Sequence, residues 1–216
     1  YGGITVQEAM PLSSKDVWVI ASQLQSALRC LHEKAQIVHL DCKPQNVFWS
    51  KSCERVVLID LGMAERLDGD LPRSVDFVSY VSPAYRPPEL WGAKRGMLRS
   101  LLVPQVDMFS YGAVLFFMLS NSKVLFPLTR AVTHDVPMSL MQWCRQHSAL
   151  LGLTSRPNNA VRKQLGEELL SGYDKLCEVC PCPWRQTILD LCNPSATKRK
   201  WPELSLLRPV LQRHRL

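Results

Sequence analysis

The sequence predicts a mainly α-helical fold that contains one small β-hairpin. Over Ser13–Lys34, apolar residues recur at spacings of three and four, which lines one face of a long amphipathic helix. Over Asp107–Leu119 the residues are apolar nearly all round, as expected of a helix buried in the core. Two short apolar runs, Val47–Trp49 and Val56–Ile59, are separated by a polar turn, and this pattern is typical of a hairpin.

The boundaries of these elements follow from local signals. Ser13 followed by Asp16 resembles a capping box, so the long helix is expected to begin there. The polar segment Asp41–Gln45 contains a proline and is expected to be a loop before the hairpin. No periodicity extends through Met63–Pro88, and a loop of that length in a compact domain is usually functional or disordered. Further helices are expected at Ser139–Leu151, Ala160–Cys177, Trp184–Leu191 and Trp201–Gln212.

Length and composition fit one globular domain. The chain has 216 residues, of which 46% are hydrophobic and 21% charged, so it is long enough to bury a core. No nucleic-acid-binding signature accompanies the net charge of +7, and we expect no nucleic acid partner. The longest apolar run, Ala113–Leu119, is too short to span a bilayer. Nothing in the sequence indicates the oligomeric state.

The eight cysteines are expected to be mostly reduced thiols, because the chain shows neither the length nor the signal peptide of a small disulfide-rich secreted domain. We therefore expect an intracellular protein, cytoplasmic or nuclear. The chain begins with Tyr1, so a targeting signal further upstream would not be visible. Cys177, Cys180 and Cys182 include the C-x₂-C spacing of zinc ligands without a second such pair. Zinc binding and incidental thiols both remain open there.

Residues 39–46, which read HLDCKPQN, are the central motif of the chain. Residues 60–62 read DLG and directly follow the second predicted strand. The two segments resemble the catalytic loop H-R-D-L-K-P-x-N and the D-F-G motif of eukaryotic protein kinases, with HLD in place of HRD and DLG in place of DFG. Three later segments resemble kinase motifs in the expected order: residues 85–89 (Y-R-A-P-E), 106–112 (D-x-W-S-x-G) and 193–199 (D-P-x-x-R with two extra residues).

This resemblance implies catalytic roles for three residues. Asp41 would accept the proton of the substrate hydroxyl and orient that hydroxyl for in-line attack. Lys43 would neutralise the charge that grows on the transferred phosphoryl group. Ser82 falls where serine/threonine kinases carry a residue that bonds both of these side chains. A lysine two residues after the catalytic aspartate favours Ser/Thr over Tyr substrates, and the implied partner is a protein substrate.

The resemblance also implies ATP and Mg²⁺ as cofactors. Phe48 would pack beneath the adenine, while Lys43 would contact the phosphates. Asn46 and Asp60 would bind Mg²⁺, a hard ion that takes oxygen ligands. His39 would pack and form hydrogen bonds below the metal site.

Two further residues are given structural roles by the same resemblance. Asp107 would hold the backbone of the catalytic loop from below. Arg199 would form an ion pair with Glu89, with Lys198 as a competing partner. Leu40 stands where the family carries an arginine that receives an activation-segment phosphate, a bond that leucine cannot make. Activity should therefore not require that phosphate.

Residues 1–6 (YGGITV) resemble the end of the hinge between the two kinase lobes. We therefore expect residues 1–216 to be the C-terminal lobe of a kinase domain, from the hinge to the last helix, with the N-terminal lobe absent. An alternative register places residues 8–10 at the hinge. In either register the Gly-rich loop, the strand lysine and its glutamate partner, which clamp the ATP phosphates, would be missing.

Three functions are consistent with these observations. The first is a Ser/Thr protein kinase that transfers the ATP γ-phosphoryl group to protein hydroxyls, with the isolated fragment inactive. The second is a pseudokinase or inactive fragment that acts as an interaction module, which a missing lobe favours and intact site residues disfavour. The third is a small-molecule kinase of the aminoglycoside or choline type, which typically lacks a lysine at position 43 and the later motifs.

Overall fold

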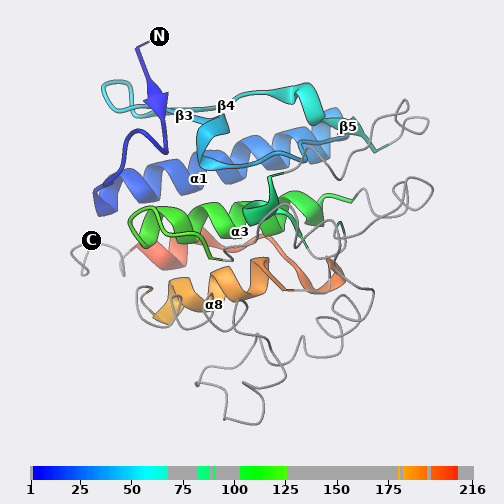
Figure 1. Ribbon diagram of the computed structural model, residues 1–216. Coiled ribbons are helices and arrows are strands. Elements are labelled where there is room, and N and C mark those ends of the chain that lie inside the picture. Colours follow the sequence, from blue (N-terminus) through cyan, green and yellow to red (C-terminus); the bar gives the residue numbers. More distant parts are fainter. Residues whose placement is uncertain are drawn as a thin grey trace.

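The computed structural model describes residues 2–67, 82–87, 90, 103–125, 180, 182–193 and 196–208 (Figure 1). Helix α3 packs against helix α1 on one side and helix α8 on the other, and a β-sheet covers the far side of α1 (Figure 1). In chain order the strands and α-helices described are β1 (Ile4–Thr5), α1 (Ser14–Cys30), β2 (Ile37–Val38), β3 (Val47–Ser50), β4 (Arg55–Leu58), β5 (Glu65–Arg66), α3 (Gln105–Leu119) and α8 (Cys182–Leu191).

Helix α1 begins where the sequence predicts. The Ser13 hydroxyl oxygen accepts the backbone N–H of Asp16 at 3.2 Å, so the start of the helix is capped. Its periodic apolar residues are buried against the core, as predicted: Val17, Ile20, Leu24 and Leu28. The α-helix ends at Cys30, earlier than the predicted Lys34, because a π-helical turn, Leu31–Ala35, follows it. Gln36 then adopts a left-handed conformation (φ 54°) and terminates the helical path.

Helix α3 confirms the predicted buried helix and starts two residues earlier than expected. Every residue from Val106 to Leu119 is buried. The Tyr111 hydroxyl donates to the backbone carbonyl of Ala21, which ties α3 to α1. A Cβ atom added to Gly112 would lie 2.8 Å from the Cys192 Sγ atom, so the close packing of α3 on α8 requires a glycine here.

The predicted hairpin over residues 47–59 is confirmed as β3 and β4, an antiparallel pair in which Val47 faces Leu58. The side chain of Gln23 joins this hairpin to α1. Its Nε2 group donates to the Glu54 carbonyl at 2.7 Å, and its Oε1 atom accepts the backbone N–H of Val56 at 2.9 Å. The turn between the strands is therefore fixed from the helix below.

The prediction of a helical C-terminal lobe with a single hairpin and no N-terminal lobe is wrong. The first residues of the chain form the strand β1, which pairs antiparallel with β3 and makes a three-stranded sheet in the order β1–β3–β4. A second sheet pairs β2 with β5. These additional strands, β1, β2 and β5, are two residues long, and backbone pairing rather than an alternating side-chain pattern defines them.

The C-terminal helices agree with the predictions only in part. Helix α8 matches the predicted Trp184–Leu191 and begins two residues earlier. Residues 201–203 are not helical, and the Pro202 carbonyl instead accepts a hydrogen bond from Gln25 on α1. A 3₁₀ turn, Leu204–Leu207, follows. The helices predicted over residues 139–151 and 160–177 lie outside the described residues. Within the described part of the chain, no helix is both long and apolar enough to cross a membrane.

Candidate active site

The segment between β2 and β3 is held by one buried carboxylate. Asp107, in the first turn of α3, is 0% exposed. Its Oδ2 atom accepts the backbone N–H of His39 at 2.7 Å, and its Oδ1 atom accepts that of Leu40 at 2.9 Å. This contact is the one that the sequence predicts for Asp107. It fixes the loop at a point where Leu40 takes a positive φ of 67°, a conformation rarely adopted by branched side chains.

His32 shares this carboxylate and is a residue that the sequence prediction missed. Its Nε2 atom lies 2.7 Å from Asp107 Oδ2, and its ring stacks on the Trp201 indole with centroids 5.8 Å apart. The residue falls at the end of the α1 pattern, where a histidine carries no signal separate from that of an ordinary helix end. Only the folded chain brings it beneath the loop.

The hydrogen bonds of His39 determine its tautomer. The backbone N–H of Asp41 can only donate, so the Nδ1 atom of His39, 3.3 Å away, is the acceptor. The carbonyl of Ile59 can only accept, so the Nε2 atom, 3.1 Å away, carries the proton. Through its two ring nitrogens His39 thus links the loop to the end of β4, in line with the structural role expected of it.

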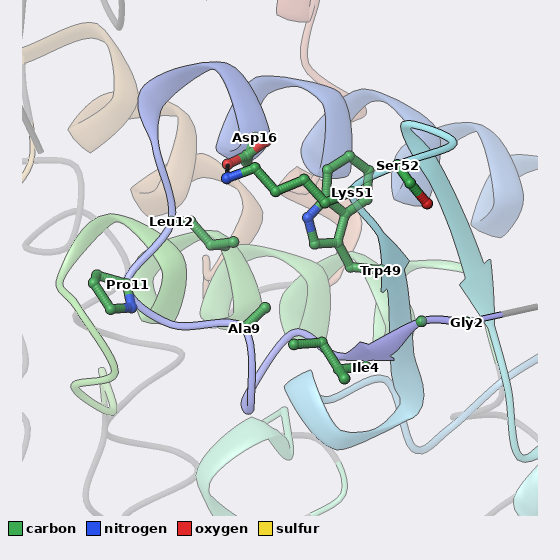
Figure 2. A pocket seen from close by; sticks show the side chains of 10 residues that line it. Gly2, Ile4, Ala9, Pro11, Leu12, Asp16, Trp49, Lys51 and Ser52 are labelled. Atoms are coloured by element: carbon green, nitrogen blue, oxygen red, sulfur yellow. Dashed lines mark ion pairs between the residues drawn. The ribbon is translucent and has the colours of Figure 1, made fainter.

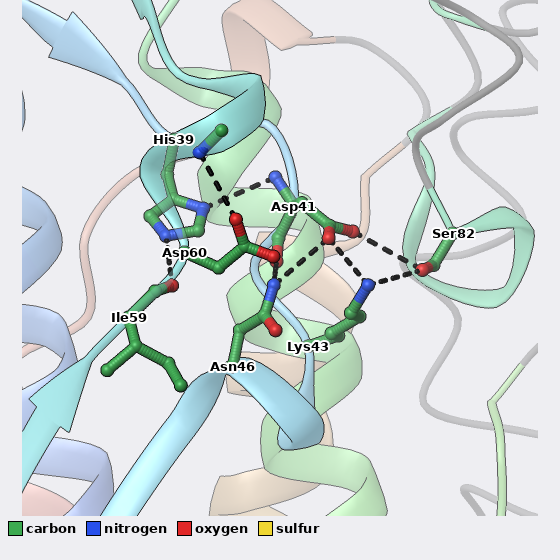
Figure 3. A network of polar contacts seen from close by, with 8 residues as sticks. His39, Asp41, Lys43, Asn46, Ile59, Asp60 and Ser82 are labelled. Carbon is green, nitrogen blue, oxygen red and sulfur yellow. Dashed lines mark hydrogen bonds and ion pairs between the residues drawn. The ribbon is translucent and has the colours of Figure 1, made fainter.

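Asp41, Lys43, Asn46 and Ser82 converge in one network (Figure 3). The Lys43 ammonium lies 2.5 Å from Asp41 Oδ2 and 3.2 Å from the Ser82 hydroxyl. That hydroxyl lies 3.3 Å from Asp41 Oδ1. These are the two contacts that the sequence predicts for Ser82. Ser82 is 41 positions from Asp41 and 39 from Lys43 in sequence, so the fold rather than local geometry brings them together.

Asn46 is oriented by the same carboxylate. Its Nδ2 group donates to the backbone carbonyl of Asp41 at 2.9 Å and to the Oδ2 atom of Asp41 at 3.0 Å. Both partners are acceptors, so the amide orientation is determined. Among the described residues the Oδ1 atom of Asn46 has no hydrogen-bond partner, and it can serve as an oxygen ligand.

Asp60 follows the end of β4 and lies near Asn46, which directly precedes β3. The backbone N–H of Ile59 donates to the carbonyl of Asn46 at 2.9 Å, which places Asp60 one residue beyond this contact. Asp60 takes a left-handed conformation (φ 64°), and its Oδ1 atom accepts the N–H of Gly62 at 3.2 Å. The residue is exposed, and its second carboxylate oxygen forms no hydrogen bond within the described part of the chain. Two hard oxygen donors, from Asn46 and Asp60, fit a Mg²⁺ ion.

Phe48 and Trp49 leave β3 on opposite faces, as consecutive strand residues do. Trp49 is buried in the core, whereas Phe48 is half-buried, and its ring lies 3.2 Å from the position of a Cβ atom at Gly3. The residue predicted to lie beneath the adenine thus sits beside β1, and a glycine leaves room for its ring.

Cys42 lies in the catalytic loop and is fully buried. Burial raises the pKa of its thiol well above the ordinary value, and the neighbouring carboxylates of Asp107 and Asp41 raise it further. The thiol is therefore neutral, and Cys42 acts as a small apolar residue within the loop.

Leu40 packs in a small apolar cluster separate from the main core. The buried members are Val38, Leu40, Leu90 and Val106, with Met63, Leu67 and Val103 packed against them. Met63 and Leu67 follow the DLG segment, and Leu90 follows the YRPPE segment. The side chain at the position of the family's arginine thus joins both ends of the segment between these motifs through apolar contacts.

Two sequence predictions involve residues outside the described part of the chain. Glu89 lies outside the described residues, so the predicted pair with Arg199 does too. The guanidinium of Arg199 donates to the carbonyls of Asn193 at 2.6 Å and Gln105 at 2.9 Å and lies 5.1 Å from the centre of the Phe109 ring. For the zinc question, Cys177 is outside the described residues, and no cluster of three metal-ligating side chains occurs within the part described.

Comparison with known proteins identifies this arrangement. A family model of the protein kinase domain matches residues 4–194. The chain belongs to the protein kinase family. Because the kinase match begins at residue 4, where β1 starts, the β-structure at the N-terminal end is part of the kinase domain. The extent of this match, like the pairing of β1 with β3, contradicts the prediction of a C-terminal lobe alone.

Several curated kinases are similar to this kinase domain. It is 34% identical over 106 residues to the serine/threonine-protein kinase pkn2 of Myxococcus xanthus, a match that covers 47% of the chain and 12% of the relative. It is 36% identical over 107 residues to the serine/threonine-protein kinase ULK3 of Xenopus laevis (49% and 20%). It is 31% identical over 125 residues to the Wee1-like protein kinase of Arabidopsis thaliana (58% and 22%). The matches thus span less than a quarter of the length of each of these relatives.

Proposed function

We propose that this kinase domain transfers the γ-phosphoryl group of ATP to serine or threonine hydroxyls of proteins. The observation that carries the proposal is the convergence of Lys43 and Ser82 on the Asp41 carboxylate. The serine/threonine kinases among its relatives support the same substrate class. Family membership favours this activity over the small-molecule kinases considered from the sequence.

The chemistry assigns Asp41 to the substrate hydroxyl. Among the described residues, its Oδ1 atom is held by one long contact of 3.3 Å from Ser82, so an incoming hydroxyl can replace that contact. As the bond between the substrate oxygen and the γ-phosphorus forms, the bond from that phosphorus to the bridging oxygen breaks. The hydroxyl proton passes to the Asp41 carboxylate. Lys43, already positioned beside Asp41, faces the charge on the transferred group.

The oxygen ligands that we propose for Mg²⁺ are Asn46 Oδ1 and the Asp60 carboxylate. When bound, the ion supplies charge neutralisation to the phosphates of ATP. Two hydrogen bonds to Asp41 hold the Asn46 amide in the required orientation. The proposed metal ligand Asn46 and the proposed hydroxyl-orienting group Asp41 are therefore fixed relative to each other. Phe48 would support the adenine from β3.

A radiolabelled-ATP transfer assay on generic protein substrates, with phosphoamino acid analysis, tests the proposal in the full-length protein. We expect Mg²⁺-dependent phosphoserine or phosphothreonine. Asp41→Asn and Asp60→Asn should each lower the rate by at least about 10²-fold. Asn tolerates the left-handed conformation of Asp60 and can still cap the turn that follows, so loss of activity would not reflect misfolding.

The matched control is Asp190→Asn, which removes an exposed carboxylate on α8. Its rate should equal that of the unchanged protein. Full transfer by the Asp60→Asn variant would refute the metal role. A protein that retains the native melting curve but transfers no phosphate under any condition would instead support the interaction-module alternative.

We also propose that activity does not require phosphorylation of the segment between the DLG and YRPPE motifs. The apolar cluster around Leu40 supports this, because it joins both ends of that segment through apolar side chains. Phosphatase treatment before the transfer assay should leave the rate unchanged. A rate that falls with phosphate removal would contradict the proposal.

A further inference from the structure

A pocket lies between β1, the end of β3 and the start of α1, and none of the proposed catalytic or metal-binding residues lines it (Figure 2). Its volume is about 490 Å³, which falls within the range of small-molecule sites, about 300–1,000 Å³. Most of its wall is apolar: Ile4, Ala9, Pro11, Leu12 and Trp49. A concave, mainly apolar site of this size with few polar groups is typical of ligand-binding pockets.

One polar group in the wall forms no hydrogen bond within the described part of the chain. Trp49 is 2% exposed, yet its indole N–H forms no hydrogen bond with any residue that the structure describes. In Figure 2 the indole nitrogen lies on the side of the ring that faces Leu12 and the pocket. The indole N–H has no partner among the described residues and lies at the pocket wall, so it is open to an acceptor that a ligand brings.

The charges at the pocket already balance. The Lys51 ammonium lies 3.5 Å from the Asp16 carboxylate, whose side chain is only 10% exposed. Ser13 donates a further hydrogen bond to the same carboxylate at 2.7 Å. A charged ligand would disrupt this pair or leave its own charge uncompensated, whereas a neutral ligand leaves the pair intact.

We propose that this pocket binds an uncharged small molecule with a flat apolar body and a carbonyl oxygen that accepts the Trp49 indole N–H. The apolar body lies among Leu12, Ala9 and Ile4, and the Asp16–Lys51 pair closes one end. The pocket is separate from the nucleotide site, so this inference does not rest on the proposed kinase activity. Trp49 is adjacent in sequence to Phe48, so the two sites lie on opposite faces of one strand.

The first test is a nuclear magnetic resonance titration of the full chain labelled with ¹⁵N at its six tryptophan indoles. N-methylbenzamide is the probe, because it joins a phenyl ring to a neutral carbonyl. The Trp49 indole resonance, assigned as the signal that Trp49→Phe removes, should move downfield and saturate at about 1–10 mM, the affinity expected for so small a ligand. Benzoate and benzylamine, which carry charges on the same ring, should bind at least fivefold more weakly (about 1 kcal/mol).

Three variants test the same site. Trp49→Phe keeps the ring but loses the donor, and probe binding measured by saturation transfer should weaken about threefold to tenfold, as expected for one neutral hydrogen bond. Ala9→Leu fills the pocket while retaining the indole, and should abolish the shift of the Trp49 resonance. Trp18→Phe is the matched control, since Trp18 does not line the pocket and its loss should leave binding unchanged.

Several outcomes would overturn the proposal. The Trp49 resonance could fail to shift, or all indole resonances could shift together without saturation. Ala9→Leu could bind the probe as well as the unchanged chain does. Binding of a short peptide with a leucine side chain, but not of the benzamide, would replace the small molecule by a peptide partner.

Discussion

His32 Nε2 lies 2.7 Å from Asp107 Oδ2, and both side chains are buried beneath the catalytic loop. The same carboxylate accepts two backbone N–H groups of that loop. Asp107 therefore connects a helix end, the loop and the central helix through one side chain. Its removal should affect stability and catalysis together.

Asp107→Asn tests this connection. An amide places an N–H₂ group against donors, so at least one hydrogen bond to a charged acceptor is lost, worth about 1.5–3 kcal/mol of unfolding free energy. The transfer rate should also fall, because the loop that bears Asp41 is no longer fixed. Denaturant unfolding and the transfer assay measure the two effects. Glu203→Gln, at an exposed position, is the control, and equal behaviour of both variants would contradict the connection.

Gln23→Ala should loosen the hairpin. It removes two hydrogen bonds to the hairpin, one at Glu54 in the turn and one at Val56 in β4. Each is worth about 0.5–1.5 kcal/mol, so the unfolding free energy should fall by about 1–3 kcal/mol. Lys15 pairs with Glu54 at the same turn, but the pair is exposed and Lys15→Ala should change nothing measurable. If the two variants have equal melting temperatures, the Gln23 contacts do not stabilise the turn.

Gly112→Ala should destabilise the chain although alanine is the better helix former. The gain in helix propensity is at most about 1 kcal/mol, while the added Cβ atom would meet Cys192 Sγ and Leu191 Cβ at 2.8 Å. Overpacking of this kind costs about 1–3 kcal/mol. Adding Cys192→Ala makes room and should recover part of the loss in thermal melting. If Gly112→Ala alone raised the melting temperature, α3 and α8 would be able to move apart without cost, which would contradict their close packing.

The thiols should differ in reactivity according to their pKa values. Hydrogen bonds from Ser50 and Ser52 lower the pKa of the exposed Cys53, so its thiolate forms at a lower pH than an ordinary thiol. Burial raises the pKa of Cys192 to about 12 and that of Cys42 well above its usual value, so both stay protonated at pH 8. Iodoacetamide labelling mapped by mass spectrometry should modify Cys53 before these two.

The Ser50→Ala/Ser52→Ala double variant provides the check on that order. Loss of the hydroxyls should move the pH midpoint of Cys53 alkylation upward. Labelling of Cys42 should appear only when denaturant is added. Rapid modification of Cys42 in the folded chain would contradict its burial.

Local sequence signals predicted the elements whose residues carry their own pattern. The cap at Ser13, the buried α3 and the β3–β4 hairpin follow from residue spacing and composition, and the structure shows each. The site positions Asp41, Lys43 and Asn46 lie within one short motif, so a linear match could find them. Ser82 was placed by its distance from a later motif.

The sequence could not reveal the features that depend on long-range contacts. The two-residue strand β1 exists through its backbone pairing with β3, and a pair of residues has no measurable period. His32 acquires its role from Asp107, 75 positions away, and nothing near His32 indicates it. The unpaired Trp49 N–H becomes visible only when its surroundings are known. Such properties belong to neighbours in space rather than to neighbours along the chain.

The contact between His39 and Asp107 spans 68 positions and ends in a helix that is buried along its length. A chain segment of that size must close, and α3 must dock, before the backbone at His39 is restrained. Partly folded states that lack a docked α3 would keep the motif HLDCKPQN but not its geometry. During refolding, the transfer activity should therefore return only when α3 docks in the core. The earlier formation of α1 alone should not restore it.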